Sequence, residues 1–119
     1  MLKHPKKKGS NAENELANML WDKGYAVVRG PASGGGVTKR FQPDLVAIKN
    51  GKIYVYEVKS RKNSGPIYID SDQVLGLTEF AKRSKGVSII AVRMKGGKWK
   101  FYTLDKLKPV GSNFRLDID

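Results

Sequence analysis

Apolar residues along this chain recur at two spacings, and the change between them separates predicted helices from predicted strands. Between Ser10 and Gly24 they return every three or four positions, as on one face of an α-helix. The same spacing covers about 72–85, a segment that Gly86 follows. Both glycines suit the position just past a helix, where a left-handed backbone is common. The pattern therefore predicts two helices.

Short runs rich in β-branched and aromatic residues predict six strands. They cover residues 25–29, 44–48, 53–59, 66–69, 87–94 and 98–102. The run 66–69 begins with a proline, which is typical of an edge strand. The resulting order is α-β-β-β-β-α-β-β, and we expect an α/β domain whose mixed central sheet is flanked by the two helices.

The regions outside these elements are basic or weakly patterned. Residues 1–9 form a basic flexible N-terminal arm, which either solubilises the chain or contacts phosphates. This arm lacks the apolar segment of a secretory signal, and we expect a cytoplasmic protein. Residues 30–42 are rich in glycine and basic residues, as in a disordered connector or a loop that orders over a DNA backbone. We assign one domain to 10–108 and a weakly patterned C-terminal tail to 109–119.

The dipeptide Asn50-Gly51 lies between two strand-like runs, which is the strongest short-range signal of a two-residue type I′ turn. Counting outward from that turn places Asp44 opposite Glu57. Because side chains alternate along a strand, Lys59 shares their face. A longer turn would shift this register and change which side chains oppose one another.

Opposed carboxylates destabilise a strand pair, so Asp44 and Glu57 need a compensating group. A divalent cation is the simplest one, because Mg²⁺ prefers oxygen ligands and is typically held by one or two carboxylates. Lys59 would then orient or deprotonate a nearby water, or neutralise charge on a scissile phosphate. The alternative is a surface hairpin whose acids are neutralised by Lys59 alone.

Glu13 is a further candidate, because it shares the apolar stripe of the first helix with Leu16 and Leu20. A carboxylate at such a position is costly unless it is paired or bound to a metal. Ser10-x-x-Glu13 is also a capping box, in which the glutamate bonds back to the Ser10 amide. The pattern alone does not decide between these roles. Glu15 falls on the more polar side of the helix, where we expect it to be solvated.

Charge and composition narrow the classes of partner and of chemistry. The 119 residues contain 23 Lys and Arg against 11 Asp and Glu, a net charge of +12. That excess favours an anionic polymer, with nucleic acid ahead of a membrane surface, and no window is apolar enough for a spanning helix. Without cysteine, a disulfide scaffold and a cysteine zinc site are excluded. His4 is the only histidine, so catalysis must rest on carboxylates, lysine, hydroxyl groups and a hard metal ion.

Several motifs of the chain occur together in one known family. Pro43-Asp44 with Glu57-Val58-Lys59 is similar to the PD-(D/E)xK motif of restriction-endonuclease-like nucleases. Four segments resemble, in order and spacing, the archaeal-type Holliday junction resolvases called Hjc or Hjr: KGSNAENEL (8–16), YAVVRGPASG (25–34), PDLVAIKNGKIYVYEVKSRK (43–62) and DQVLGLTEFAKRSKG (72–86). The similarity covers roughly residues 8–104.

The resemblance implies a restriction-endonuclease-like nuclease domain and a homodimer that binds four-way DNA junctions by their shape. Two symmetric active sites would make paired nicks with Mg²⁺, for which Mn²⁺ can substitute, and without an organic cofactor. Strand 87–94, the second helix and strand 99–102 are the best candidates for the dimer surface.

The same resemblance implies roles for residues of the hairpin and the first helix. Asp44 and Glu57 would bind the metal together with the Val58 carbonyl. Lys59 would lie beside the attacking water. Glu13 matches the family's glutamate of the first helix, which adds a metal-binding and catalytic role to the capping role described above.

Other implied residues lie in loops and at helix ends. Ser33 matches a serine that assists cleavage from a flexible loop. The residues expected to contact DNA are Lys8, Arg29, Lys39, Arg40, Arg61, Lys62 and Gln73. Loop solubility and polarity at a helix N-terminus are the alternative explanations for Ser33 and Gln73.

Two other functions remain open on the sequence. Another nuclease of the same fold, acting on linear duplex DNA, would contain the same hairpin. A non-enzymatic basic DNA-binding module accounts for the charge of +12 but not for the opposed carboxylates.

Overall fold

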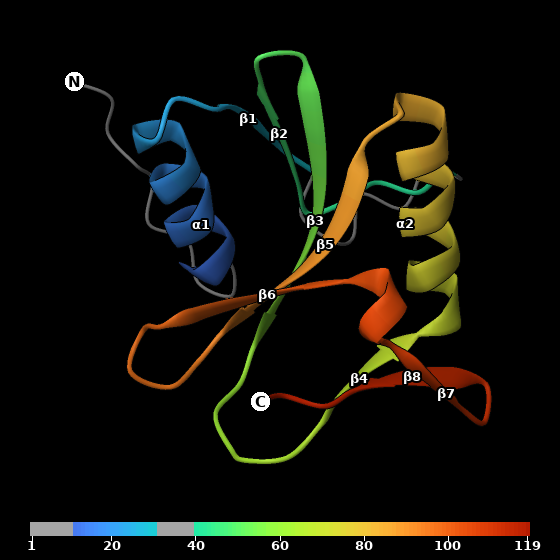
Figure 1. Cartoon of the computed structure of the whole chain (residues 1–119). Coiled ribbons are helices and arrows are strands. Elements are labelled where there is room, and N and C mark those ends of the chain that lie inside the picture. The colour runs from blue at the N-terminus through green and yellow to red at the C-terminus, as the bar shows by residue number, and fades with distance from the viewer. Residues whose placement is uncertain (1–10, 31–39) are drawn as a thin grey trace.

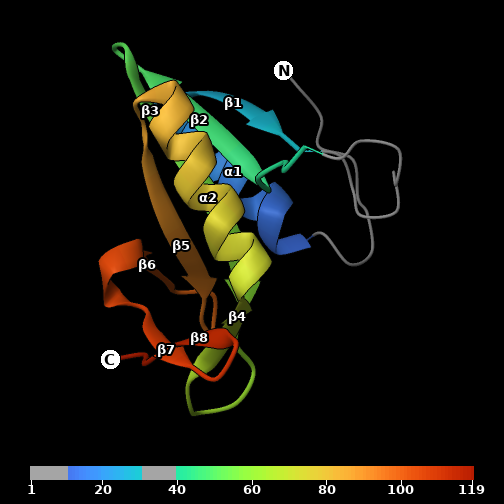
Figure 2. The same cartoon turned by 90° about the vertical axis from the view of Figure 1, so that its right-hand side faces the viewer.

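Two helices cover opposite faces of a five-stranded sheet, and a three-stranded sheet lies at one end of the molecule (Figures 1 and 2). The computed structural model describes residues 11–30 and 40–119. The elements are α1 (Asn11–Asp22), β1 (Ala26–Arg29), β2 (Leu45–Lys49), β3 (Lys52–Ser60), β4 (Ile67–Asp70), α2 (Ser71–Ser84), β5 (Val87–Arg93), β6 (Trp99–Thr103), the 3₁₀ helix η1 (Leu104–Lys106), β7 (Lys108–Val110) and β8 (Asn113–Leu116). Both predicted helices and the six predicted strands are confirmed, with small shifts at their ends.

The large sheet has the strand order β1-β2-β3-β5-β6. Its strands β3 and β5 run parallel and its other neighbours are antiparallel, so the sheet is mixed, as the sequence predicts. Parallel neighbours cannot be joined by a tight turn, and the connection between β3 and β5 contains β4 and α2. In the described part of the chain, no helix is long and apolar enough to cross a membrane.

The hairpin of β2 and β3 has the predicted turn and register. Asn50 and Gly51 have φ values of 53° and 76°, the positive values that a type I′ turn requires. The pairs Lys49–Lys52, Ile48–Ile53 and Val46–Val55 form as counted from the turn. The ladder ends at Leu45–Tyr56, one pair before the predicted pairing of Asp44 with Glu57.

Alternation along the central strands divides the core into two layers. The layer beneath α2 contains Val55, Ile69, Val74, Leu77, Ile90, Val92 and Leu116. The layer beneath α1 contains Leu16, Leu20, Leu45, Ala47, Tyr56 and Ala91. Each helix is therefore held on its own face of the sheet by apolar burial, and the strand ends between the helices are left for polar residues.

The segment 109–119 is part of the fold and not a tail, which corrects the assignment made from the sequence. Strand β8 pairs with β4 on one side and with β7 on the other. Leu116 is fully buried in the layer beneath α2. The sequence does not predict β7 and β8, because three or four residues are too few to show the alternation of apolar and polar positions that marks a strand. Strand β4 is an edge strand as predicted, but of this small sheet.

Candidate active site

Polar residues from four parts of the chain lie near the point where β2 begins and β3 nears its end. Asp44 immediately precedes β2, while Glu57 and Lys59 belong to β3. Gln73 lies in the first turn of α2, and Glu13 in the first turn of α1. The sheet places the carboxylates, and both helices direct their first turns toward them.

Asp44 is held by two hydrogen bonds to β3. Its main-chain N–H donates to the Tyr56 carbonyl at 3.1 Å. Its carboxylate accepts a hydrogen bond from the Val58 N–H, with 2.8 Å between Oδ2 and N. The side chain thus folds over the neighbouring strand, which explains why the regular ladder stops at Leu45.

Glu57 is a buried carboxylate, with only 4% of its surface exposed. Lys59 Nζ lies 3.3 Å from its Oε2 atom, which confirms that these two residues of β3 share a face. Gln73 Nε2 donates to the same oxygen at 3.1 Å. The structure therefore brings together three of the residues that the sequence analysis named.

The carboxyl groups of Asp44 and Glu57 both have raised pKa values. Burial, followed by the charge of Asp44, raises the pKa of Glu57 to about 7. Burial also raises the pKa of Asp44, although its bond from the Val58 N–H acts in the opposite direction. Lys59 opposes the rise in pKa at both carboxyl groups, and Arg29 also opposes it at Asp44, but neither cancels it. The site therefore lacks positive charge when both carboxylates are ionised.

This deficit and the donor set fit a hard divalent cation. Carboxylate and carbonyl oxygens are the ligands that Mg²⁺ prefers, and an added positive charge would offset the repulsion between Asp44 and Glu57. Among residues 11–30 and 40–119, no three His, Cys, Asp or Glu side chains already converge on one point. The carboxylates of Asp44 and Glu57 are thus the central pair, and the Val58 main chain lies beside them.

Glu13 lies at the border of this pair and is engaged by a strand residue. Arg29 Nη2 lies 3.1 Å from Glu13 Oε1, and Arg29 Nη1 donates to Asn14 Oδ1 at 2.6 Å. The charge of Glu13 nevertheless contributes to the raised pKa of both Asp44 and Glu57. The capping alternative involves Ser10, which lies outside the described residues.

A cleft of about 450 Å³ opens beside these residues on the α1 side. Its lining consists of Asn11, Ala12, Glu13, Val58, Lys59, Ser60 and Lys62. Lys59 links this cleft to the buried carboxylate, because it lines the cleft and also contacts Glu57. The cleft therefore leads from the surface to the end of β3 at which Lys59 and Glu57 are in contact.

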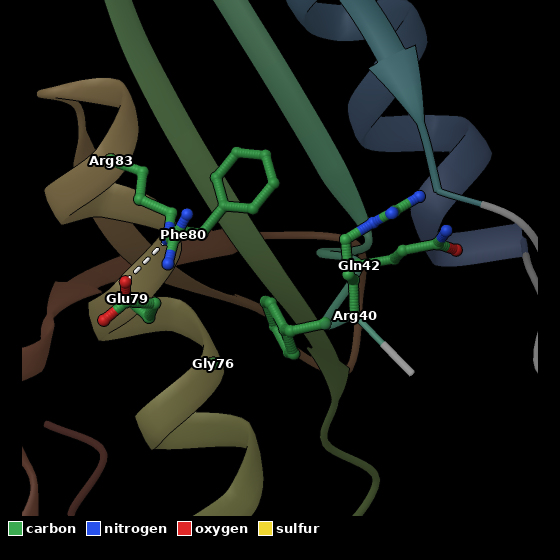
Figure 3. A pocket seen from close by; sticks show the side chains of 7 residues that line it. Arg40, Gln42, Gly76, Glu79, Phe80 and Arg83 are labelled. Atoms are coloured by element: carbon green, nitrogen blue, oxygen red, sulfur yellow. Dashed lines mark hydrogen bonds and ion pairs between the residues drawn. The ribbon is translucent and has the colours of Figure 1, made fainter. Parts of the chain in front are cut away.

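The remaining predicted residues are distributed differently. Lys62 lines the cleft, and Arg61 directly precedes it with its Nε bonded to the Asn63 carbonyl at 2.8 Å. Arg40 lines a separate pocket beside α2, shown in Figure 3. Lys8, Ser33 and Lys39 lie outside the described residues.

Glu15 is a structural residue that the sequence interpretation placed in solvent, and that expectation is wrong. Its carboxylate accepts hydrogen bonds from Arg93 Nε at 3.0 Å and from Trp99 Nε1 at 2.8 Å. It thereby ties the first turns of α1 to the hairpin of β5 and β6. No local signal reveals this role, because the partners follow Glu15 by 78 and 84 residues.

Comparisons with known proteins agree with the geometry. The sequence model of the family described as archaeal Holliday junction resolvase (Hjc) matches residues 4–119. The crossover junction endodeoxyribonuclease Hjc of Sulfurisphaera tokodaii is 42% identical over 115 residues, covering 96% of this chain and 78% of the relative. That of Archaeoglobus fulgidus is 35% identical over 113 residues, covering 94% and 80%.

A solved structure extends the comparison to three dimensions. It is the structure of Archaeoglobus fulgidus Hjc, a Holliday junction resolvase from an archaeal hyperthermophile. The two chains align with a TM-score of 0.75 and 29% identity, over 87% of this chain and 85% of the other. The alignment confirms the predicted restriction-endonuclease-like fold.

Proposed function

Because the chain belongs to the archaeal Holliday junction resolvase (Hjc) family, we propose that it is an endodeoxyribonuclease that resolves four-way DNA junctions by paired nicks. The observation that carries the proposal is the buried carboxylate of Glu57, which lies near Asp44 and contacts Lys59. Two like charges in one buried position destabilise the fold unless they serve a ligand. A module that only binds DNA would have no use for them.

The nuclease depends on a divalent metal, and Mg²⁺ suits the oxygen donors best, with Mn²⁺ as a substitute. Asp44, Glu57 and the Val58 carbonyl would hold it, with Glu13 as the further carboxylate. When bound, the ion supplies positive charge that stabilises the reacting phosphate and favours ionisation of water. This assignment rests on the burial of both carboxylates and on the charge of Asp44 beside Glu57, which raise the pKa values of the two groups.

The chain's own residues complete the chemistry. Lys59 spans the distance from the buried Glu57 to the cleft, so its ammonium group can orient the attacking water or contact a phosphate oxygen. Gln73 is a positioning residue, because it donates to the Oε2 atom that Lys59 also contacts. Arg29 positions Glu13 through their ion pair, and its charge also lowers the pKa of Asp44.

Positive charge elsewhere on the chain provides affinity for DNA. We assign contacts with the sugar–phosphate backbone to Lys8, Arg29, Lys39, Arg40, Arg61 and Lys62, and a contact near the cut to Gln73. Ser33 is proposed to assist cleavage. With a net charge of +12, binding should weaken steeply as salt increases, because phosphate contacts release counterions.

We also propose that two copies associate through the part of the sheet that α2 leaves uncovered. Val28 of β1 pairs with Val46, and Val46 pairs with Val55 in the layer beneath α2. Val28 therefore faces the α2 side, but it is 62% exposed, because α2 packs over the central strands. Ile48 lies on the same face and is 39% exposed.

A pocket of about 540 Å³ adjoins this face between α2 and the segment 40–42 (Figure 3). Phe41, Gly76 and Phe80 supply its apolar lining, and Figure 3 shows Phe80 directed from α2 toward the strands. Leu75 on the same helix is 66% exposed. An apolar area bordered by charged side chains is typical of a protein interface, and a second copy is the partner that paired nicks require.

We do not place the dimer surface on strand 87–94, one of the surfaces expected from the sequence. β5 lies in the middle of the large sheet between β3 and β6. Its residues Ile90, Ala91 and Val92 are fully buried. The strong apolar pattern of this strand reflects burial on both faces and not contact with a partner.

A labelled four-way junction incubated with Mg²⁺ tests the function, with linear duplex of the same sequence as the comparison. We expect cutting of the junction alone, and at least about a hundredfold slower cutting by Asp44→Asn, because that change removes a metal ligand. The asparagine oxygen can still accept the Val58 N–H, so the fold and junction binding should persist. Asp105→Asn, which changes an exposed aspartate of η1, is the control and should cut normally.

The other outcomes separate the alternative functions. Equal cutting of junction and duplex would identify a nuclease that acts on linear DNA. Binding without cutting by either protein would identify a non-enzymatic DNA-binding module.

A further inference from the structure

We propose that a second groove, between the loop after β3 and the turn of the β5–β6 hairpin, binds the DNA backbone next to the scissile phosphate. Lys95 is its principal contact. The inference rests on the proposed function and extends it. The groove has a volume of about 240 Å³ and is lined by Arg61, Lys62, Asn63, Ser64, Met94 and Lys95. Figure 1 shows that the loop and the hairpin leave the same end of the large sheet.

The two walls of the groove are joined by main-chain bonds. The parallel pairing of β3 with β5 reaches Ser60–Arg93. One residue further, the Arg61 N–H donates to the Arg93 carbonyl at 2.9 Å. The Arg61 side chain then turns back, and its Nε donates to the Asn63 carbonyl at 2.8 Å. The backbone of the fold therefore defines the groove, and the side chain of Arg61 holds the loop in place.

The hairpin wall is anchored by a residue of α1. Glu15 of α1 accepts hydrogen bonds from Arg93 and Trp99, the residues at the two ends of the hairpin turn region. This contact neutralises Arg93 and leaves the charge of Lys95 for a ligand. Lys95 is exposed and, within the described residues, forms no ion pair with an acidic group.

The groove is continuous with the candidate active site. Lys62 lines both this groove and the cleft that contains Glu13 and Lys59. The shared lysine is exposed and also lacks an acidic partner among the described residues. A strand whose phosphate is cut in the cleft would carry its next phosphates past Lys62 toward Lys95.

The lining selects the chemical class of the ligand. Three cationic side chains accompany the amide of Asn63 and the hydroxyl of Ser64, and no carboxylate lines the groove. Cations and neutral hydrogen-bond donors bind phosphate oxygens, and such contacts position DNA without reading its bases. The groove should therefore bind any DNA sequence and position the strand for cleavage.

Junction binding without cleavage tests this assignment directly. In an Asp44→Asn background, Lys95→Gln should weaken junction binding by roughly threefold to tenfold and reduce the salt dependence by about one phosphate contact. Lys52→Gln removes an equal charge at the other end of β3 and is the matched control. It should leave both quantities close to those of the parent.

A junction with single uncharged methylphosphonate linkages near the mapped cut locates the contact. One such linkage should weaken binding by the parent but cause no further loss in Lys95→Gln, because the two changes remove the same interaction. The inference would be overturned if every methylphosphonate linkage weakened binding by Lys95→Gln as much as it weakens binding by the parent. It would also be overturned if Lys95→Gln bound the junction as tightly as Lys52→Gln. If wild-type protein cuts no junction at all, the proposed function fails instead, so the two failures are distinguishable.

Discussion

At the scale of single residues, Glu57 shows how opposing effects decide the state of one carboxyl group. Lys59 and Gln73 both contact its Oε2 atom, and the lysine favours the ionised form. Burial and the neighbouring charge of Asp44 favour the protonated form, and they prevail, because the pKa rises from 4.5 to about 7. The site thus stores a repulsion that a cation would relieve.

The raised pKa of Glu57, caused first by burial and then by the charge of Asp44, predicts how the free energy of unfolding depends on pH without metal. The pKa of Glu57 in the folded state lies above its value in the unfolded state. The stabilising contribution of this group is therefore complete below about pH 4.5 and is lost as pH rises through about 7. At about pH 8 to 9, the free energy of unfolding should be lower by on the order of 3 kcal/mol. Glu57→Gln cannot ionise. In EDTA it should therefore melt higher than wild type at pH 8, and the advantage should vanish near pH 4.5.

The control for this prediction is Glu79→Gln, which changes a glutamate in an exposed i,i+4 ion pair on α2. Its melting temperature should follow that of wild type at every pH. Added Mg²⁺ should raise the melting temperature of wild type more than that of Glu57→Gln, because binding to the folded state stabilises it. A constant difference between wild type and Glu57→Gln across this pH range would contradict the prediction.

At the scale of elements, the structure distinguishes those specified locally from those specified by distant partners. The β2–β3 hairpin is specified by its own turn, because Asn50 and Gly51 take the positive φ values that few other residues accept. Strand β8 has no such signal, and it exists because β4 and β7 pair with it and because Leu116 reaches the core. Local signals therefore describe the β2–β3 hairpin but not the small sheet.

The contribution of β8 can be measured through its buried leucine. Leu116→Ala should destabilise the protein by about 2–5 kcal/mol, because it leaves a cavity in the layer beneath α2. Val110→Ala, in the neighbouring strand β7, is the control and should cost less than about 0.5 kcal/mol, because Val110 is exposed. Chemical denaturation of both variants gives the comparison. If Leu116→Ala is as stable as the control, the C-terminal strands do not belong to the cooperative fold.

At the scale of the whole molecule, charge and apolar surface are expected to serve different partners. The chain has 23 basic and 11 acidic residues, and the resulting net positive charge supports attraction to DNA. The exposed side chains of Val28, Ile48 and Leu75 support contact between protein copies. A resolvase that makes paired nicks needs both surfaces, since one active site cuts one strand.

Introducing charge on the proposed dimer surface should separate the copies. Leu75→Lys should weaken the dimer by at least about tenfold in Kd, because it would bury an unpaired charge in the interface. Val87→Lys is a control, because Val87 is 46% exposed but pairs with Tyr54, which packs in the α1 layer. Sedimentation measures the association, and plasmid-borne junctions report paired against single nicks. A Leu75→Lys dimer as tight as wild type would show that this surface is not the interface.

The sequence by itself determined the elements and the chemistry that depend on short-range order. Helical periods, the Asn50-Gly51 turn and strand alternation predicted two helices, the hairpin, and the shared face of Glu57 and Lys59. Each of these follows from residues within one turn or one strand pair, whose geometry the backbone dictates.

Only the tertiary structure decided the features that depend on distant segments. It ended the ladder before Asp44, tied Glu15 to the β5–β6 hairpin, paired Arg29 with Glu13, and placed Leu116 in the core. These contacts join residues far apart along the chain, so neither the periodicity of apolar residues nor a turn motif predicts them. They arise when apolar burial packs the helices and sheets together, and that packing decides which polar groups meet.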